Sequence, residues 1–222
     1  MDADGLKTDP NNWPVFGLVA DELHSLGGYA FHAHGGYEKE IYADFAQRAT
    51  DGVELLQFAV YRGIGLEGWY HILNAGFRFP AVGASDYPYC RAFGDCRTYC
   101  RLDHGKPTFE SWNRAAAAGK SFVTTGPLLE VTVDGKHPGD TISRRTGRQE
   151  LHVTVQLTSP VAPVDEITII EGGQVRSRRK LTNADRIGPM TWKTTITVNG
   201  STWLAVRAFA KSRAGRENVE AH

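Results

Sequence analysis

Residues 18–37, LVADELHSLGGYAFHAHGGY, predict a helix followed by a strand that ends in histidines. Apolar residues recur at helical spacing in the first half, and Gly27 and Gly28 then stop the helix and release the chain into a short apolar run. Side chains of an extended run alternate between faces, so we expect His32 and His34 on the same side of a strand, at its carboxyl end.

A second apolar run, residues 79–84, is expected to form a strand that leads to Asp86. Histidine and aspartate at the ends of neighbouring strands indicate a metal site. Between them lies GVELLQF (52–58), a run typical of a buried strand, which carries Glu54. A buried carboxylate is costly unless it is paired, hydrogen-bonded or bound to metal. Glu54 is therefore either a site residue or a glutamate at a strand start that is exposed or pairs with an arginine.

The segment 22–36 resembles the third motif of the polymerase and histidinol phosphatase (PHP) superfamily of metal-dependent hydrolases, and GASD (83–86) resembles their fourth motif. The order of the later motifs is similar to that of the CehA/McbA-type branch of the superfamily. These later motifs are Arg97-Thr-Tyr99, Trp112 with Ala115 to Gly119, SFVTTGPLL (121–129) and Val133-Asp134-Gly135. The resemblance covers residues 14–222 and implies an α/β barrel followed by a β-rich region.

The resemblance also implies a reaction, the hydrolysis of an ester, amide, carbamate or phosphoester bond in a small-molecule substrate by hydroxide bound to zinc or manganese. His34 and Asp86 match the motif ligands, Glu54 matches a glutamate near the metals and is also a candidate ligand, and His32 is a further candidate ligand. Asp86 or Glu54 could serve as ligand or as proton acceptor. Arg97 is a candidate for binding an anionic substrate or the charge that develops on an oxyanion, although arginines commonly form surface ion pairs.

The sequence departs from the PHP pattern in its fourth motif and at its start. The family has a histidine two residues after the aspartate, where this chain has Pro88, and no H-x-H strand precedes the first helix. We therefore expect a chain truncated at both ends, or a homo-oligomer in which a second copy completes the barrel. The alternative is a non-catalytic scaffold whose β-rich region binds a partner or a glycan.

The chain divides into two expected domains. Residues 1–126 alternate strand and helix, which predicts a partial PHP-type, distorted TIM-like α/β barrel, because a complete barrel takes about 200 to 250 residues. Residues 127–222 show the alternation and turns of a small antiparallel β-sandwich. Gly172-Gly173 and Asn199-Gly200 each predict a hairpin within it.

Composition narrows the function classes. The 25 Lys and Arg residues balance 25 Asp and Glu residues, so no net field favours nucleic acid or an anionic membrane. No run reaches the roughly 18 apolar residues of a membrane span, and the polar start is unlike a secretory signal. We expect a soluble protein, cytoplasmic by default, or exported if a signal precedes the present start. Cys90, Cys96 and Cys100 have the spacing of neither a disulfide framework nor a zinc site, so we expect ordinary thiols.

Overall fold

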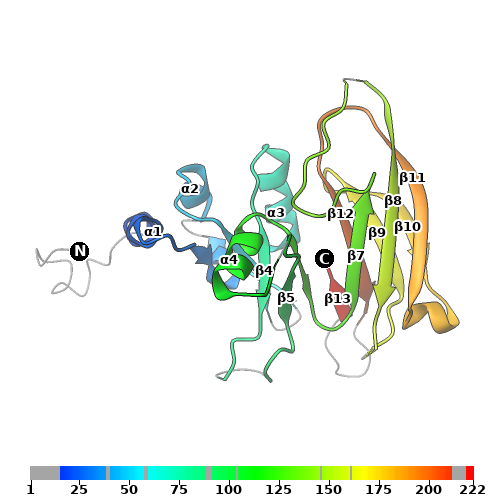
Figure 1. Cartoon of the computed structure of the whole chain (residues 1–222), viewed down its shortest axis with the longest axis horizontal. Coiled ribbons are helices and arrows are strands. Elements are labelled where there is room, and N and C mark those ends of the chain that lie inside the picture. Colours follow the sequence, from blue (N-terminus) through cyan, green and yellow to red (C-terminus); the bar gives the residue numbers. More distant parts are fainter. Residues whose placement is uncertain are drawn as a thin grey trace, which may run out of the picture.

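The fold comprises a small, mostly parallel sheet covered by helices and two further sheets that pack face to face (Figure 1). It was obtained as a computed structural model. The residues described are 16–38, 41–57, 60–88, 92–103, 105–145, 147–160, 162–211 and 219–222.

The helices are short, and their ends follow local sequence signals. Helix α1 ends as predicted at a glycine, Gly27, whose φ of 77° is left-handed, and Thr108 caps α4 by accepting a hydrogen bond from the Ser111 N–H. The described helices are α1 (Phe16–Ser25), α2 (Ile41–Ala46), α3 (Gly65–Asn74) and α4 (Phe109–Ala117), with 3-10 segments η1 (Ala33–Glu38) and η2 (Asn183–Arg186).

The first sheet, sheet A, contains β1 (Phe31–His32), β2 (Gly52–Gln57), β3 (Val60–Tyr61) and β4 (Ala81–Ala84). Strand β2 lies in the middle, with β1 and β4 parallel to it on either side, while β3 is antiparallel to it. Val53 and Leu55 of β2 are fully buried against residues of α2 and α3. The next residue along the strand, Leu56, belongs to a different core cluster, because successive side chains of a strand face opposite ways.

The other two sheets are antiparallel. Sheet B runs in the order β10-β9-β12-β13-β6-β5 and sheet C in the order β11-β8-β7, and the largest core cluster draws on both. The strands of sheet B are β5 (Arg97–Cys100), β6 (Ser121–Thr124), β9 (Glu166–Glu171), β10 (Gln174–Lys180), β12 (Leu204–Ala210) and β13 (Val219–Ala221). Those of sheet C are β7 (Leu128–Val133), β8 (Gln149–Thr158) and β11 (Met190–Val198).

The prediction of a TIM-like α/β barrel is wrong. The described chain forms three sheets, none of them closed, and is mainly β. The alternation of strand and helix was real, but β5 and β6 pair antiparallel although α4 lies between them. Periodicity predicts that a segment is a strand or a helix, and it carries no information on strand direction. Among the described strands, only β1, β2 and β4 keep the parallel arrangement that a barrel needs.

Two local predictions also fail. The extended run expected through His34 stops at His32, because η1 begins at Ala33 and His34 has a φ of 57°. Asn199-Gly200 does not close a hairpin, since β11 before it pairs with β8 in sheet C while β12 after it pairs with β9 in sheet B. A turn dipeptide bends the chain but does not decide which strands pair. Gly172-Gly173 does close the predicted hairpin, between β9 and β10.

Strand β13 holds the two halves of the molecule together. It pairs with β12 on one side and, through Ala221 and Thr124, with β6 on the other. The chain end accordingly lies in the middle of the molecule, between the helices and the paired sheets (Figure 1). The division at residue 126 stays a prediction, although β5 and β6 lie before it and share sheet B with the later strands.

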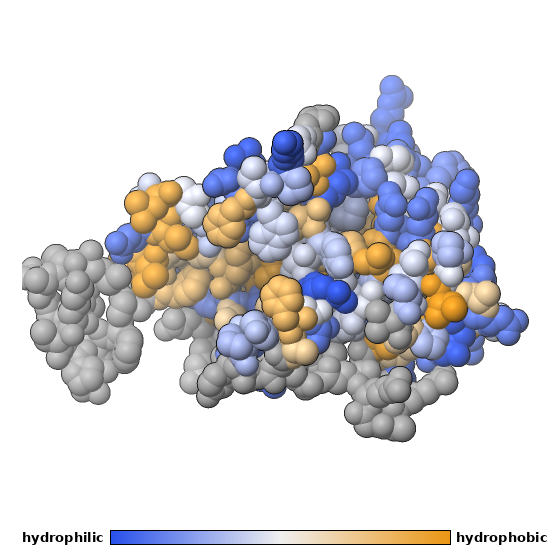
Figure 2. All heavy atoms as spheres, turned by 60° about the horizontal axis from the view of Figure 1, so that its bottom comes forward, coloured by the Kyte–Doolittle hydropathy of each residue, from blue (hydrophilic) through white to orange (hydrophobic). Residues whose placement is uncertain are grey.

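Figure 2 shows apolar side chains gathered around α1, where Leu18 and Val19 of the helix and Leu26 just after it are exposed. Within the described ranges, no helix has the length and apolar character needed to cross a membrane.

Candidate functional site

The candidate site lies where the parallel strands of sheet A end. His34 follows β1 by two residues and Asp86 follows β4 by two, while Glu54 lies in β2 between those strands. Because carboxyl ends of parallel strands share one edge of a sheet, the topology brings segments from three parts of the chain together. This edge faces the lower side of Figure 1, where the chain leaves β4 and later returns as β5.

Glu54 is the centre of this arrangement. Its side chain is buried, with 9% of the residue exposed, and its Oε2 accepts a hydrogen bond of 2.7 Å from the backbone N–H of His34. Burial raises the pKa of Glu54, and the negative charge of Asp86 raises it further. The His34 N–H, the His34 ring and the Arg62 guanidinium act in the opposite direction on this pKa. Glu54 therefore lies among groups of both signs.

Both outer residues of the site have an unusual backbone. His34 has a φ of 57° and Asp86 a φ of 54°, in the left-handed region that residues other than glycine adopt at a cost of order 1–2 kcal/mol. Such conformations persist where the surroundings impose them, and they concentrate at functional sites. At His34 the conformation turns the N–H toward the Glu54 carboxylate.

Two glycines let the loop after β1 pack directly on the loop after β3. A Cβ atom on Gly35 would lie 2.0 Å from the carbonyl oxygen of Arg62, and one on Gly63 would lie 2.1 Å from that of Gly35. The Ile64 N–H donates to the Gly35 carbonyl oxygen at 2.9 Å. No side chain fits between these backbones. Gly35 thus packs directly against the backbone of residues 62–64.

His32 has a different environment from His34. Its Nε2 lies 2.8 Å from Oδ2 of Asp44 in α2, and its ring stacks on Phe16 of α1 at a centroid distance of 4.0 Å. His32 therefore links two helices to β1. Its proposed role as a metal ligand stays a prediction.

Arg97 lies on β5, beside the end of β4. The Oγ1 of the next residue, Thr98, accepts from the Gly83 N–H at 2.8 Å and donates to the Gly83 carbonyl oxygen at 2.9 Å, which ties the two strands together. The Arg97 guanidinium lies 5.9 Å from the centroid of the Tyr99 ring, and its buried Nε has no hydrogen-bond partner among the described residues. Its role in binding charge stays a prediction.

Arg62 is the residue that the sequence analysis missed. It is exposed, follows β3, and its positive charge lowers the pKa of Glu54. The available signal was the run Arg62-Gly63-Ile64-Gly65, in which two glycines directly follow a strand.

The donor types suit zinc or manganese, but their arrangement does not make a complete site. Among the described residues, no group of three or more His, Cys, Asp or Glu side chains is placed to hold a metal ion. Position 88, where a histidine would belong to the motif, is proline. Any metal at His34 and Asp86 would therefore need ligands beyond those that these strands bring together.

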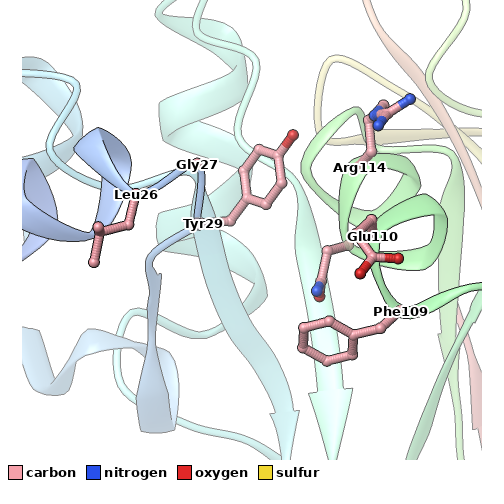
Figure 3. A pocket seen from close by; sticks show the side chains of 8 residues that line it. Leu26, Gly27, Tyr29, Phe109, Glu110 and Arg114 are labelled. Atoms are coloured by element: carbon pink, nitrogen blue, oxygen red, sulfur yellow. The ribbon is translucent and has the colours of Figure 1, made fainter.

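Two hollows in the described structure lie elsewhere. One of about 360 Å³ separates residues 26–29 from α4, with the Tyr29 ring facing that helix and Phe109, Glu110 and Arg114 on the opposite wall (Figure 3). Residues 26–29 precede β1, so this hollow lies at the amino end of the strand. Another, of about 290 Å³, lies between β5, β6 and β7. Neither contains His34, Glu54 or Asp86.

Comparison of the chain with protein-family models, with curated proteins and with solved structures found no match.

Proposed function

We propose that this protein is a hydrolase of small molecules, of the metal-dependent PHP type, with its site at His34, Glu54 and Asp86. The observation that supports the proposal is the buried Glu54 carboxylate, which binds the N–H of a left-handed His34 and is influenced by both His34 and Asp86. Ionisable groups with perturbed pKa values and strained neighbours are typical of catalytic sites.

The roles of the three residues follow from their chemistry. His34 and Asp86 are the proposed ligands of zinc or manganese, which when bound lowers the pKa of a water molecule. Glu54 is the proposed proton acceptor, because its raised pKa brings the carboxylate closer to the range in which a general base works near neutral pH. The bond cleaved is an ester, amide, carbamate or phosphoester.

The proposal is tested by the metal content and hydrolytic activity of the purified chain. After incubation with zinc or manganese and desalting, we expect about one metal ion per chain, lost in His34→Ala and Asp86→Ala. Glu54→Gln should keep the metal and lose hydrolysis of para-nitrophenyl acetate and bis(para-nitrophenyl) phosphate. The control variants are His71→Ala and Asp21→Asn, whose side chains are exposed on α3 and α1. Metal that the control variants lose equally would contradict the proposed site.

A non-catalytic scaffold is the second candidate. Pro88 and the absence of a three-ligand group among the described residues favour it. It predicts a chain without metal or hydrolytic activity, in which His34→Ala and Asp86→Ala fold as the parent does. Its β-rich region, residues 127–222, would then bind a partner or a glycan.

A second copy of the chain is a proposed partner under either function. The exposed apolar side chains of α1 offer a surface that association would cover (Figure 2). Light scattering measures the mass in solution, and a dimer that Leu18→Ser and Leu26→Ser dissociate would support this partner. A monomer at every concentration tested would exclude it.

A further inference from the structure

The two antiparallel sheets that pack face to face differ in width. Sheet B has six described strands and sheet C has three, so sheet C cannot cover all of sheet B. Tyr99 of β5 and Phe122 of β6 lie opposite each other on one face of sheet B, and their rings stack with centroids 5.3 Å apart. Phe122 packs against the core that the two sheets share, whereas 39% of Tyr99 is exposed. Sheet C therefore stops short of Tyr99.

The hollow of about 290 Å³ lies where a further strand of sheet C would run. Tyr99 and Phe122 line it together with residues 129–131 of β7, and His137 and Pro138 of the following loop line it as well. Strand β7 is the last described strand of sheet C on this side, the one nearest to β5 (Figure 1). The hollow thus combines an aromatic surface with the edge of a strand.

The main chain of β7 has unpaired hydrogen-bonding groups along this edge. The N–H and the carbonyl oxygen of Val133 both bond to Lys136, so they point away from β8. Main-chain groups along an antiparallel strand alternate between its two sides, so those of Leu129 and Val131 point away from β8 as well. No described residue hydrogen-bonds to Leu129 or Val131 on that side. An edge of this kind is a template for pairing with another extended chain.

The unpaired charge at this edge is negative. Glu130 is exposed, the residue opposite it on β8 is the uncharged Gln156, and no described cation pairs with it. The cations that line the hollow are already paired, since Arg101 and Lys120 both bind Asp103. A basic side chain on the open side of β7 would therefore have a free carboxylate beside it, and cross-strand pairs of opposite charge are favourable.

We propose that an extended peptide of a partner protein binds beside β7 as a fourth strand of sheet C, with apolar side chains over Tyr99 and a basic side chain beside Glu130. Main-chain hydrogen bonds to Leu129 and Val131 supply affinity, and the alternating side chains supply specificity. This inference goes beyond the proposed hydrolase and does not depend on it, because the hollow contains none of the residues proposed for catalysis.

The probe is a fluorescein-labelled peptide amide of sequence Thr-Val-Lys-Val-Thr, and fluorescence anisotropy measures its binding. In the antiparallel pairing that places its lysine opposite Glu130, the main-chain groups of both valines point toward β7 and those of the lysine point away. Methylation of both valine nitrogens removes the donors to β7 and should weaken binding at least tenfold. Methylation of the lysine nitrogen is the matched control, and this peptide should bind like the unmodified one.

Val131→Pro tests the same hydrogen bonds from the side of the protein. It removes an N–H at the open edge and leaves the ladder with β8 intact, so peptide binding should weaken about tenfold. Val131→Ala is its control, because it shortens the side chain but keeps the N–H, and it should bind the peptide more tightly than Val131→Pro does. Thermal melts show whether each variant is folded.

A charge reversal tests the contact with Glu130. Glu130→Lys should shift the preference from the lysine peptide to Thr-Val-Glu-Val-Thr, by about threefold for each peptide. Glu150→Lys makes the same change at an exposed position of β8 outside its ladder with β7, and it should leave the preference unchanged.

The inference is overturned if the parent chain does not bind the lysine peptide. It is also overturned if the two methylated peptides bind equally and Glu130→Lys keeps the original preference, and these comparisons decide the matter if Val131→Pro does not fold. Light scattering covers the remaining occupant, a second copy of the chain. A dimer that Val131→Pro dissociates, in a protein that binds no peptide, would assign this edge to self-association and overturn the inference.

Discussion

Two buried glutamates, Glu54 in β2 and Glu220 in β13, are held in different ways. Both are nearly inaccessible, with 9% and 1% exposed, and burial raises the pKa of each. Glu220 receives two hydrogen bonds from the Arg207 guanidinium, one of them 2.8 Å long from Nη2 to Oε2, and a third of 2.8 Å from the Tyr61 hydroxyl. Glu54 receives one from the backbone of His34.

The difference separates a structural carboxylate from a functional candidate. Glu220 has a full set of donors from β12 and β3, so its charge is compensated where sheet A meets sheet B. Such a network is stable while complete and fails when one partner is lost. Glu54 lies among charges of both signs, beside strained residues, at an edge where strands end. The same substitution at these two positions should therefore have opposite effects.

The largest effect is expected from Glu220→Gln. It leaves Arg207, whose side chain is 27% exposed, without its counter-charge, which should lower the free energy of unfolding by about 3 kcal/mol. Urea denaturation measures the change. Glu166→Gln is the control, because Glu166 pairs with the exposed Arg178 at 3.6 Å and should change stability by about 0.5 kcal/mol or less. Equal changes in the free energy of unfolding of the two variants would show that the Glu220 network does not stabilise the contact between sheets A and B.

Gly63→Ala should have the next largest effect. The new Cβ would lie 2.1 Å from the Gly35 carbonyl oxygen and 2.7 Å from that of His34, so the two loops must separate, at a cost of about 2 kcal/mol. Gly65→Ala is a matched control, since its φ of 60° is also left-handed but its Cβ would meet nothing within 4 Å. The difference in unfolding free energy isolates the packing of the loops. We expect metal binding to fail only in Gly63→Ala.

Tyr61→Phe removes one of the donors to Glu220 and keeps the ring. The loss should be about 1 kcal/mol, because the two bonds from Arg207 remain. Arg207 also lies over the Tyr61 ring at 5.7 Å, and this contact is retained. Denaturation in urea gives the value, and a loss as large as that of Glu220→Gln would mean that the hydroxyl, and not the ion pair, holds the carboxylate.

The smallest change, and one of opposite sign, is expected from Glu54→Gln. Because the folded-state pKa of Glu54 is raised, ionisation costs the folded protein more than the unfolded chain. The parent therefore loses stability as pH rises from the unfolded-state pKa through the folded-state pKa. Near pH 8 the variant should be slightly more stable than the parent, and near pH 4 the gain should vanish. Unfolding measured at both pH values checks this, and destabilisation near pH 8 would make Glu54 a structural residue like Glu220.

Much of the local structure could be predicted from the sequence. Helical spacing followed by Gly27 predicted α1 and its end, and the apolar run at 52–58 predicted β2. Glu54 stood out because a carboxylate inside an apolar strand needs a reason, and the structure gives it the His34 N–H. These signals depend on residues that are close together in the sequence, so they hold in any tertiary structure.

The site was predictable only in part. His34 and Asp86 were chosen as residues at the carboxyl ends of strands, and both also have left-handed backbones, which no periodicity encodes. His32 was paired with His34 on the assumption of an extended chain, whereas His32 ends β1, His34 lies in η1, and Asp44 binds the His32 ring. Arg62 was missed because its position depends on the contact between Gly35 and Gly63, which are 28 residues apart in the sequence.

The sequence by itself determined where the chain turns, which segments are apolar enough to be strands, and that one strand carries a buried acid. Only the tertiary structure decided that β5 and β6 run antiparallel, that β13 joins two halves of the molecule, and that the sheets stay open. The physical reason is the separation along the sequence over which the interactions act. Turns and periodic patterns arise from interactions between near neighbours, while strand direction and pairing depend on which distant edges can satisfy each other's hydrogen bonds and bury each other's apolar faces.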